Sequence, residues 1–207
     1  MKKEKVILFG GTFDPVHNAH VIVATASAEI ISAEKVIFIP AKRSPLKESS
    51  PIASDKERLQ MLKLVISDNP EFDVSDYELQ KIGQSFTIET VRFFKNSLQG
   101  EPEIYWLMGA DNITELGNWF KINELIDECN LAVMHRAGFE KPDFSGLKEK
   151  LGEARIAKLE QNVVATPLID ISSTEIRRRI AAGEDVSEML NAQVLNYILN
   201  HNLYRIK

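Results

Sequence analysis

The stretch KVILFGGTFDPVHNAH, residues 5–20, decides the fold that we expect for this chain of 207 residues. Its apolar run at 6–9 is typical of a strand that is buried on both faces of a parallel sheet. The Gly-Gly pair at 10–11 predicts a turn that ends this strand, where backbone N–H groups approach a phosphate because no Cβ intervenes. The Asp-Pro pair at 14–15 predicts the start of a helix, and the Ala- and Val-rich stretch 18–31 supplies it.

Two histidines follow the predicted turn. His17 and His20 are three residues apart, so both imidazoles project from one side of the first helical turn. Two cationic donors above a phosphate-binding turn indicate chemistry on the phosphates of a nucleotide. The same spacing also suits a metal ion, but His135 and His201 lie far away in sequence, so a third ligand is unsupported and we assign no metal site.

The composition indicates an ordinary globular protein, with 44% apolar and 27% charged residues. Its 25 basic and 30 acidic residues give a net charge of −5, so no basic field favours nucleic acid or an anionic membrane as a partner. Cys129 is the single cysteine, which excludes an internal disulfide and suits a reducing cytoplasm. No apolar run has the length of a signal peptide or a membrane span. We expect one domain, residues 1–207, in the cytoplasm, and leave a homo-oligomer open.

Apolar segments of strand length alternate with helical patterns along the chain. This alternation predicts an α/β fold, a Rossmann-like doubly wound parallel sheet with helices on both faces and extra C-terminal helices. Ligands of such sheets bind beyond the carboxyl ends of the strands. The expected strands are residues 6–9, 36–39, 72–74, 104–108, 131–134 and 163–165. The expected helices are residues 18–31, 56–66, 87–98, 122–128, 147–159, 174–182 and 187–200.

A second candidate phosphate site is DISSTEIRRR, residues 170–179. Ser172 and Glu175 form a predicted capping box that fixes a helix start just after Ile171. The free N–H groups and the dipole of that helix end attract an anion. The side chains available to add donors are Ser173, Thr174, Arg177 and Arg178. The alternative is a well-capped basic helix without a ligand.

These two segments together resemble a known superfamily. GGTFDPVHNAH resembles the signature of the nucleotidyltransferases that carry a His-x-Gly-His motif, with Ala19 in place of the glycine, and ISSTEIR resembles their second signature. Within the superfamily the chain resembles, over nearly its whole length, the bacterial nicotinate-nucleotide adenylyltransferase family. The resemblance implies transfer of the adenylyl group of ATP to nicotinate mononucleotide, which gives deamido-NAD and pyrophosphate in NAD biosynthesis. It also implies Mg²⁺ that is carried by the ATP phosphates.

The resemblance assigns the site residues. Catalytic roles fall to His17, His20, Lys47 and Arg177. ATP contacts fall to Gly10, Gly11, Thr12, Phe13, His20, Asp111, Arg136, Ser172, Ser173 and Arg177. Contacts with nicotinate mononucleotide fall to Thr12, Lys47, Thr87, Trp119 and Phe120. Leu46 and Ala137 depart from the family pattern, which usually has histidine and proline at these positions.

The residues themselves leave simpler interpretations of several assignments open. Asp111 follows an expected strand, where a carboxylate accepts hydrogen bonds from ribose hydroxyls, but an Asp after Gly also caps helices. Trp119 and Phe120 are able to stack on an aromatic ring, although such pairs are more often part of the core. Thr87 is expected to start a helix whose N–H groups meet a carboxylate, or to be a plain cap. Arg58 also matches the family, and an exposed helix arginine is the simpler interpretation.

Other functions remain open at this point. An adenylyltransferase of the same superfamily that prefers nicotinamide mononucleotide differs by a contact that separates an acid from an amide. A non-catalytic nucleotide sensor is able to share the scaffold, because a fold does not determine a function. A metal-dependent hydrolase with a His-x-x-His motif is the third alternative.

Overall fold

Six parallel strands form the centre of the molecule. The computed structural model describes residues 3–42, 50–136 and 140–205. The strand order is β3-β2-β1-β4-β5-β6, and every neighbouring pair is parallel, which confirms the expected Rossmann-like sheet. The strands are β1 (Lys5–Gly11), β2 (Lys35–Pro40), β3 (Phe72–Val74), β4 (Glu103–Gly109), β5 (Asn130–Arg136) and β6 (Val163–Thr166).

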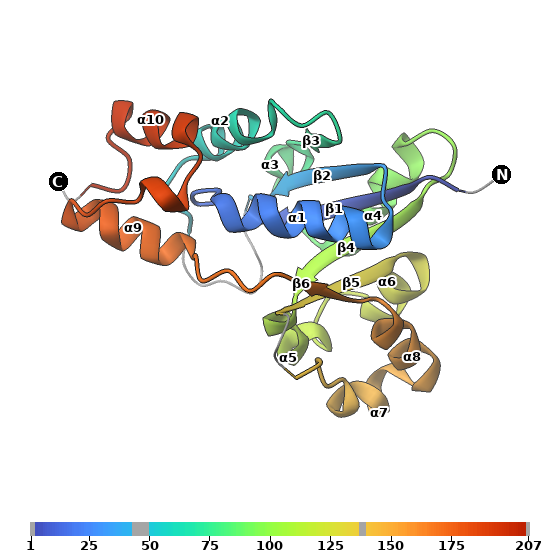
Figure 1. The fold of residues 1–207 in the computed structure, drawn as a ribbon. Coiled ribbons are helices and arrows are strands. Elements are labelled where there is room, and N and C mark those ends of the chain that lie inside the picture. The colour runs from blue at the N-terminus through green and yellow to red at the C-terminus, as the bar shows by residue number, and fades with distance from the viewer. Residues whose placement is uncertain (1–2, 43–49, 137–139, 206–207) are drawn as a thin grey trace.

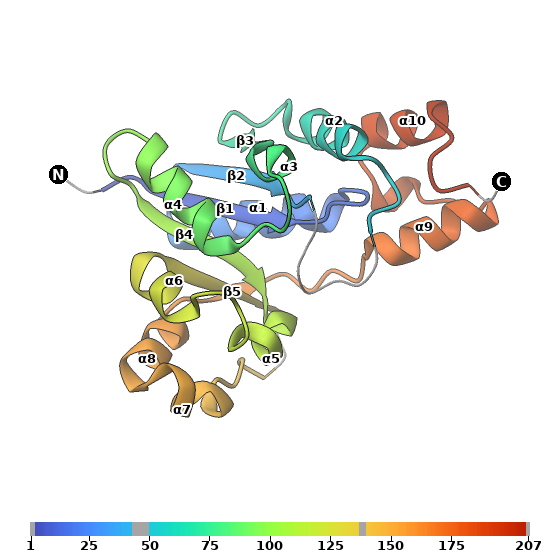
Figure 2. The same cartoon turned by 180° about the vertical axis from the view of Figure 1, so that it is seen from behind.

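Helices cover both faces of this sheet (Figures 1 and 2). The longer ones are α1 (Asn18–Ile31), α2 (Asp55–Ile66), α4 (Thr87–Ser97), α6 (Ile122–Glu128), α8 (Glu153–Gln161), α9 (Ser173–Ala182) and α10 (Ala192–Asn200). The shorter turns are α3 (Tyr77–Gln80), η1 (Ala110–Asn112), α5 (Ile113–Leu116), η2 (Ser145–Leu147), α7 (Lys148–Leu151) and η3 (Ser187–Met189). No helix of the described residues is both long and apolar enough to cross a membrane.

Two hydrophobic cores result from the alternation of side chains along the strands. Ile7 and Phe9 of β1 face a core that includes residues of α1, α2, α9 and α10. Val6 and Leu8 face the opposite core, with residues of α4, α6 and α8. Because successive strand residues point to opposite faces, a continuous apolar run was the correct signal for a strand buried on both sides.

Gly10 and Gly11 continue β1, so the predicted turn at this pair is wrong. Gly10 pairs with Ile39 of β2 in the parallel register. A Cβ on Gly10 would lie 2.6 Å from Cη2 of the buried Trp106, and a Cβ on Gly11 would lie 2.8 Å from Cζ of Phe13. Glycine is therefore needed here because two aromatic rings pack against the strand backbone.

The expected helix boundaries differ from the structure in three places. Helix α1 begins at Asn18 with His17 as its N-cap, so the Asp-Pro pair at 14–15 does not start it. The expected helix 147–159 is divided at Gly152, whose φ of 80° ends α7 and precedes α8. The expected helix 187–200 is a 3₁₀ turn followed by α10. The short turns α3, η1 and α5 were not predicted.

We expect Gly10→Ala to lower the free energy of unfolding by about 2 kcal/mol, because the new methyl group overlaps a ring that is fixed in the core. Gly146→Ala is the matched control, since no atom lies within 4 Å of its built Cβ and its φ is outside the left-handed region. Denaturant unfolding measures both variants. Equal stability of the two proteins would contradict the packing explanation.

Candidate active site

A cavity of about 630 Å³ opens at the carboxyl ends of β1 and β4. In this strand order β2 lies on one side of β1 and β4 on the other, so the direction of the chain connections reverses between β1 and β4. The carboxyl ends of the strands at such a reversal are the usual place of a ligand site. The cavity brings together these predicted site residues: Gly10, Gly11, Thr12, His20, Thr87, Asp111, Trp119 and Phe120. It therefore joins the first predicted phosphate segment to the predicted pyridine end. The predicted residues with described side chains that do not line it are Phe13, His17, Ser172, Ser173 and Arg177.

The backbone that follows β1 is held by donors from distant parts of the chain. Arg58 Nη1 donates to Thr12 O at 2.6 Å, Arg177 Nη1 donates to Asp14 O at 2.7 Å, and Ser173 Oγ donates to Pro15 O at 2.9 Å. In a trans peptide the N–H points opposite to the C=O, so the N–H of the residue after Thr12 points away from Arg58. These contacts bring the two signature segments side by side.

Arg58 is fully buried, so its interpretation as an exposed helix arginine is wrong. Its Nη2 donates to Asp55 Oδ1 at 2.6 Å, which places a carboxylate beside the buried charge. Helix α10 packs against α2, the helix that carries Arg58. The C-terminal helix thus packs on the helix whose arginine reaches the predicted phosphate loop.

His17 and His20 lie ring against ring at the start of α1. Their ring centroids are 3.7 Å apart, with 30° between the planes. The backbone N–H of His17 donates to His20 Nδ1 at 3.2 Å, so a neutral His20 ring carries its proton on Nε2. Of the two, His20 lines the cavity.

The charge state of His17 differs from the expectation. Its side chain is buried, and this desolvation lowers the pKa of His17 from 6.5 to about 4. The ring is therefore neutral near pH 7, and the prediction of two cationic donors is wrong for His17. The short sequence spacing gave the geometry of the pair correctly but contained no information on burial.

The N-terminus of α9 forms the second half of the predicted phosphate end. Ser172 is the N-cap, and its Oγ accepts a hydrogen bond from the Glu175 N–H at 3.2 Å. The reciprocal half of the predicted capping box is missing, because the Glu175 carboxylate binds Arg178 and Arg179. Hydrogen bonds from these arginines, Arg178 first, lower the pKa of Glu175 to about 2. Arg178, a candidate donor to the anion, is therefore salt-bridged to Glu175 and Glu184.

Aromatic side chains form the other end of the cavity. Thr87 is the first residue of α4, and the ring of Phe86 lies 4.6 Å from that of Phe120, centroid to centroid. Trp119 is half-buried, and its Nε1 has no hydrogen-bond partner among the described residues. Both members of the predicted Trp-Phe pair therefore contribute to the cavity wall.

Asp111 lies in the 3₁₀ turn that directly follows β4 and does not cap a helix. The cap of that turn is Gly109, where a Cβ would overlap the Asp111 carboxylate. Asn112 Nδ2 donates to Asp111 Oδ1 at 3.4 Å. An exposed carboxylate thus lies at the edge of the cavity, within reach of ligand hydroxyl groups.

Sequence reasoning missed a buried polar cluster that borders the cavity. Glu78 is buried and its Oε1 accepts a hydrogen bond from Thr90 Oγ1 at 2.7 Å. Burial raises the pKa of Glu78. Ser85 is also buried and lines the same cavity. The four-residue turn that carries Glu78 has no periodicity, so no pattern could have indicated that this carboxyl points inward.

Some residues that we predicted for the site lie outside the part of the chain that the structure describes. Lys47 and Leu46 belong to residues 43–49, and Ala137 belongs to 137–139, which are outside the described ranges. Arg136 ends β5, and only its backbone is described. Within residues 3–42, 50–136 and 140–205, no group of three or more His, Cys, Asp or Glu side chains is arranged to hold a metal ion.

The low pKa of His17 predicts a pH dependence of stability. Between pH 6.5 and about 4 the unfolded chain binds a proton that the folded chain does not bind, so the free energy of unfolding falls as the pH is lowered. The loss amounts to about 3 kcal/mol over this range. His17→Gln should flatten the slope, as measured by urea unfolding at several pH values. His201→Gln, at an exposed position, is the control, and an unchanged slope in His17→Gln would contradict the assignment.

Comparison with known proteins agrees with this geometry. A family model described as Cytidylyltransferase-like matches residues 8–179. The probable nicotinate-nucleotide adenylyltransferases of Dehalococcoides mccartyi and Clostridium perfringens are each 37% identical, with 97% and 98% of both chains covered. The structure of Plasmodium falciparum nicotinic acid mononucleotide adenylyltransferase complexed with NaAD has a TM-score of 0.74, at 19% identity and 97% coverage of both chains. The chain belongs to the cytidylyltransferase-like family and, within it, to the nicotinate-nucleotide adenylyltransferases.

Proposed function

We propose that this chain transfers the adenylyl group of ATP to nicotinate mononucleotide and releases deamido-NAD and pyrophosphate. One observation carries the proposal. The two signature segments meet at the loop after β1, and a cavity lined by the end of β1 and by His20 continues to an aromatic end at Trp119 and Phe120. A triphosphate beside the start of α9 is thus able to lie next to a pyridine nucleotide in the cavity. The names of the curated relatives agree with this activity.

The reaction needs positioning more than covalent chemistry. A phosphate oxygen of the mononucleotide attacks the α-phosphorus of ATP. The bond from that phosphorus to the oxygen that bridges the α- and β-phosphates breaks on the opposite side, in line with the attack. The electron pair of the broken bond leaves with pyrophosphate. Because the mononucleotide attacks directly, no side chain becomes covalently attached. The protein contributes by holding both phosphates in place and by stabilising the charge that develops during transfer.

Each side chain or N–H group at the predicted phosphate end has a proposed role. His20 lines the cavity, and because its Nδ1 accepts from the His17 backbone, its Nε2–H is suited to donate to a phosphate oxygen. The N–H of Phe13 points away from buried Arg58 and is suited to the same task. Arg177 and Ser173 reach the loop from α9, next to where the β- and γ-phosphates are proposed to bind. Lys47 is proposed to bind the mononucleotide phosphate.

Mg²⁺ fits this proposal as a companion of ATP. The Asp14 carboxylate accepts hydrogen bonds from Ile52 N, Ala53 N and Tyr204 Oη, so its oxygens are already engaged. The donor set near the proposed triphosphate is made of N–H groups and arginines, which suit phosphate oxygens and not a cation. Mg²⁺ that is bound to the ATP phosphates would neutralise part of their charge. The residues of this chain would bind the remaining phosphate oxygens.

The aromatic end is proposed to bind the pyridine ring. Trp119 and Phe120 supply faces for stacking, and Thr87 begins a helix of 11 residues whose free N–H groups favour an anion. A carboxylate on the ring gains from that helix end, whereas a neutral amide gains less. This difference favours nicotinate mononucleotide over nicotinamide mononucleotide. Asp111 is proposed to accept hydrogen bonds from the ribose of ATP.

Steady-state pyrophosphate release with ATP and each mononucleotide tests substrate choice. We expect kcat/KM for nicotinate mononucleotide to exceed that for nicotinamide mononucleotide by about tenfold or more, the scale of one charge-assisted hydrogen bond. Equal values would remove the helix end from substrate selection. An absence of release with either substrate would favour the non-catalytic sensor.

We expect His20→Ala to lower kcat by about a hundredfold or more, because one donor to the transition state is lost. His201→Ala is the matched control, since His201 lies on the exposed surface just after α10. Stopped or continuous pyrophosphate assays at saturating substrates measure both. Near-normal turnover of His20→Ala would exclude the imidazole from the mechanism.

A further inference from the structure

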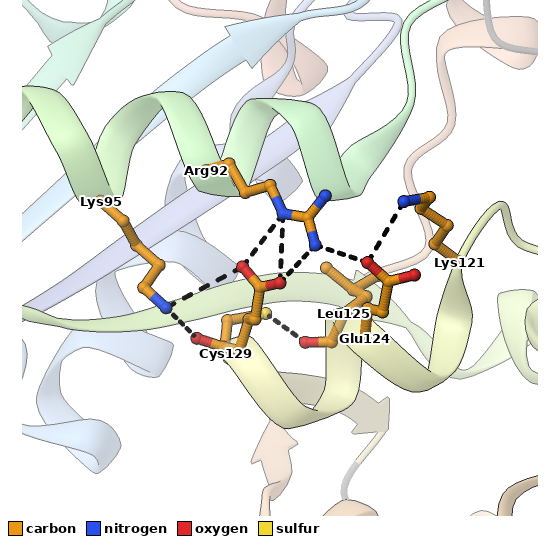
Figure 3. A network of polar contacts seen from close by, with 7 residues as sticks. Arg92, Lys95, Lys121, Glu124, Leu125 and Cys129 are labelled. Carbon is orange, nitrogen blue, oxygen red and sulfur yellow. Dashed lines mark hydrogen bonds and ion pairs between the residues drawn. The ribbon is translucent and has the colours of Figure 1, made fainter.

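An ion-pair network joins α4 to α6 next to the aromatic end of the cavity (Figure 3). Arg92 of α4 donates through Nε to both carboxylate oxygens of Glu128, at 3.1 and 3.2 Å. Its Nη2 donates to Glu128 Oε1 at 2.5 Å and to Glu124 Oε2 at 2.6 Å. One guanidinium therefore binds two carboxylates on successive turns of α6. This two-armed geometry is the kind of surface pair that contributes measurably.

The network extends to Lys121, the residue that directly follows Phe120 of the cavity wall. Lys121 Nζ donates to Glu124 Oε2 at 3.3 Å, so Glu124 is shared by Lys121 and Arg92. Lys121 is the N-cap of α6, in the left-handed region at φ 54°, and directly follows Phe120. A chain of contacts thus runs from the end of the Trp-Phe segment to the middle of α4.

The same two helices carry the two walls of the aromatic end. Phe86 and Thr87 stand at the N-terminus of α4, about one and a half turns before Arg92. Phe120 stands just before α6, one turn before Glu124. The rings of Phe86 and Phe120 pack against one another, with their centroids 4.6 Å apart, and both residues line the cavity. The spacing of α4 and α6 therefore sets where this part of the cavity wall lies.

We propose that Arg92 is a positioning residue that fixes the spacing between Thr87 and the Trp119–Phe120 wall, and thereby sets the affinity for the mononucleotide. The inference rests on the proposed function and deepens it. Arg92 does not line the cavity, so it acts only through the helices that it joins. The ATP end depends on the loop after β1 and on α9, which the network does not contact.

Arg92→Met tests the proposal, because methionine keeps an unbranched side chain on α4 and removes the guanidinium. Arg155→Met is the matched control. Arg155 of α8 binds Asp127 on the same helix α6, at 2.8 Å through Nε and 2.6 Å through Nη2, but joins α6 to α8 and not to α4. Arg92→Lys retains the charge without the two-armed geometry and should recover part of the effect. Melting temperatures of all variants establish that each is folded.

We expect Arg92→Met to raise KM for nicotinate mononucleotide about fivefold, while KM for ATP and kcat change less than about twofold. Arg155→Met should leave all three values near those of the parent protein. An unchanged KM for the mononucleotide would overturn the proposal, as would an equal rise for both substrates or in both variants. An equal rise for both substrates or in both variants indicates general loosening of the fold.

A binding measurement separates this inference from the proposed function. Titration of nicotinate mononucleotide alone, followed by tryptophan fluorescence, reports on Trp106 and Trp119, which both line the cavity. If the parent protein releases no pyrophosphate, the proposed function fails, and the fluorescence titration alone decides the role of Arg92. A Kd that is larger in Arg92→Met but not in Arg155→Met supports the positioning role of Arg92. Equal Kd values in the two variants overturn it.

Discussion

The hydrogen bonds on the loop after β1 are the constraint on which the rest of the site depends. Asp14 is buried, and its carboxylate accepts from Ile52 N at 2.8 Å, Ala53 N at 3.1 Å and Tyr204 Oη at 2.8 Å. A buried carboxylate is costly unless such donors surround it. The backbone carbonyl of the same residue accepts from Arg177. The predicted phosphate end is therefore complete only after the C-terminal part of the chain has folded back onto the N-terminal loop.

The two ends of the cavity are built by different physical means. At the phosphate end, contacts such as Ser173 with Pro15 join residues 158 positions apart. At the aromatic end, Phe86 directly before α4 packs on Phe120, which precedes α6, and exposed ion pairs join the two helices. The contacts at the predicted phosphate end are part-buried hydrogen bonds to backbone carbonyls, and those between α4 and α6 are ion pairs in which one guanidinium binds two carboxylates. Both kinds of contact limit the freedom of the elements that they join.

The sequence predicted the sheet well and the environment of single side chains poorly. All six strands lie within two residues of their expected ends, because apolar runs between helical patterns are local signals. Gly10 was read correctly as a close-approach position, but the approaching group is Trp106 of β4. Arg58 was expected to be exposed and Glu78 was missed. Arg58 reaches the loop after β1 and Glu78 contacts Thr90 of α4, and helical periodicity contains no information on such partners.

The two histidines at the start of α1 differ in their surroundings. His17 is the N-cap of α1, where the helix dipole disfavours a cation, and its burial already lowers the pKa of the ring to about 4. His20 uses Nδ1 as an acceptor, so a neutral ring offers one N–H donor. A guanidinium keeps its charge at any pH of interest. Among the described residues of the predicted phosphate end, permanent positive charge therefore comes from Arg58 and Arg177.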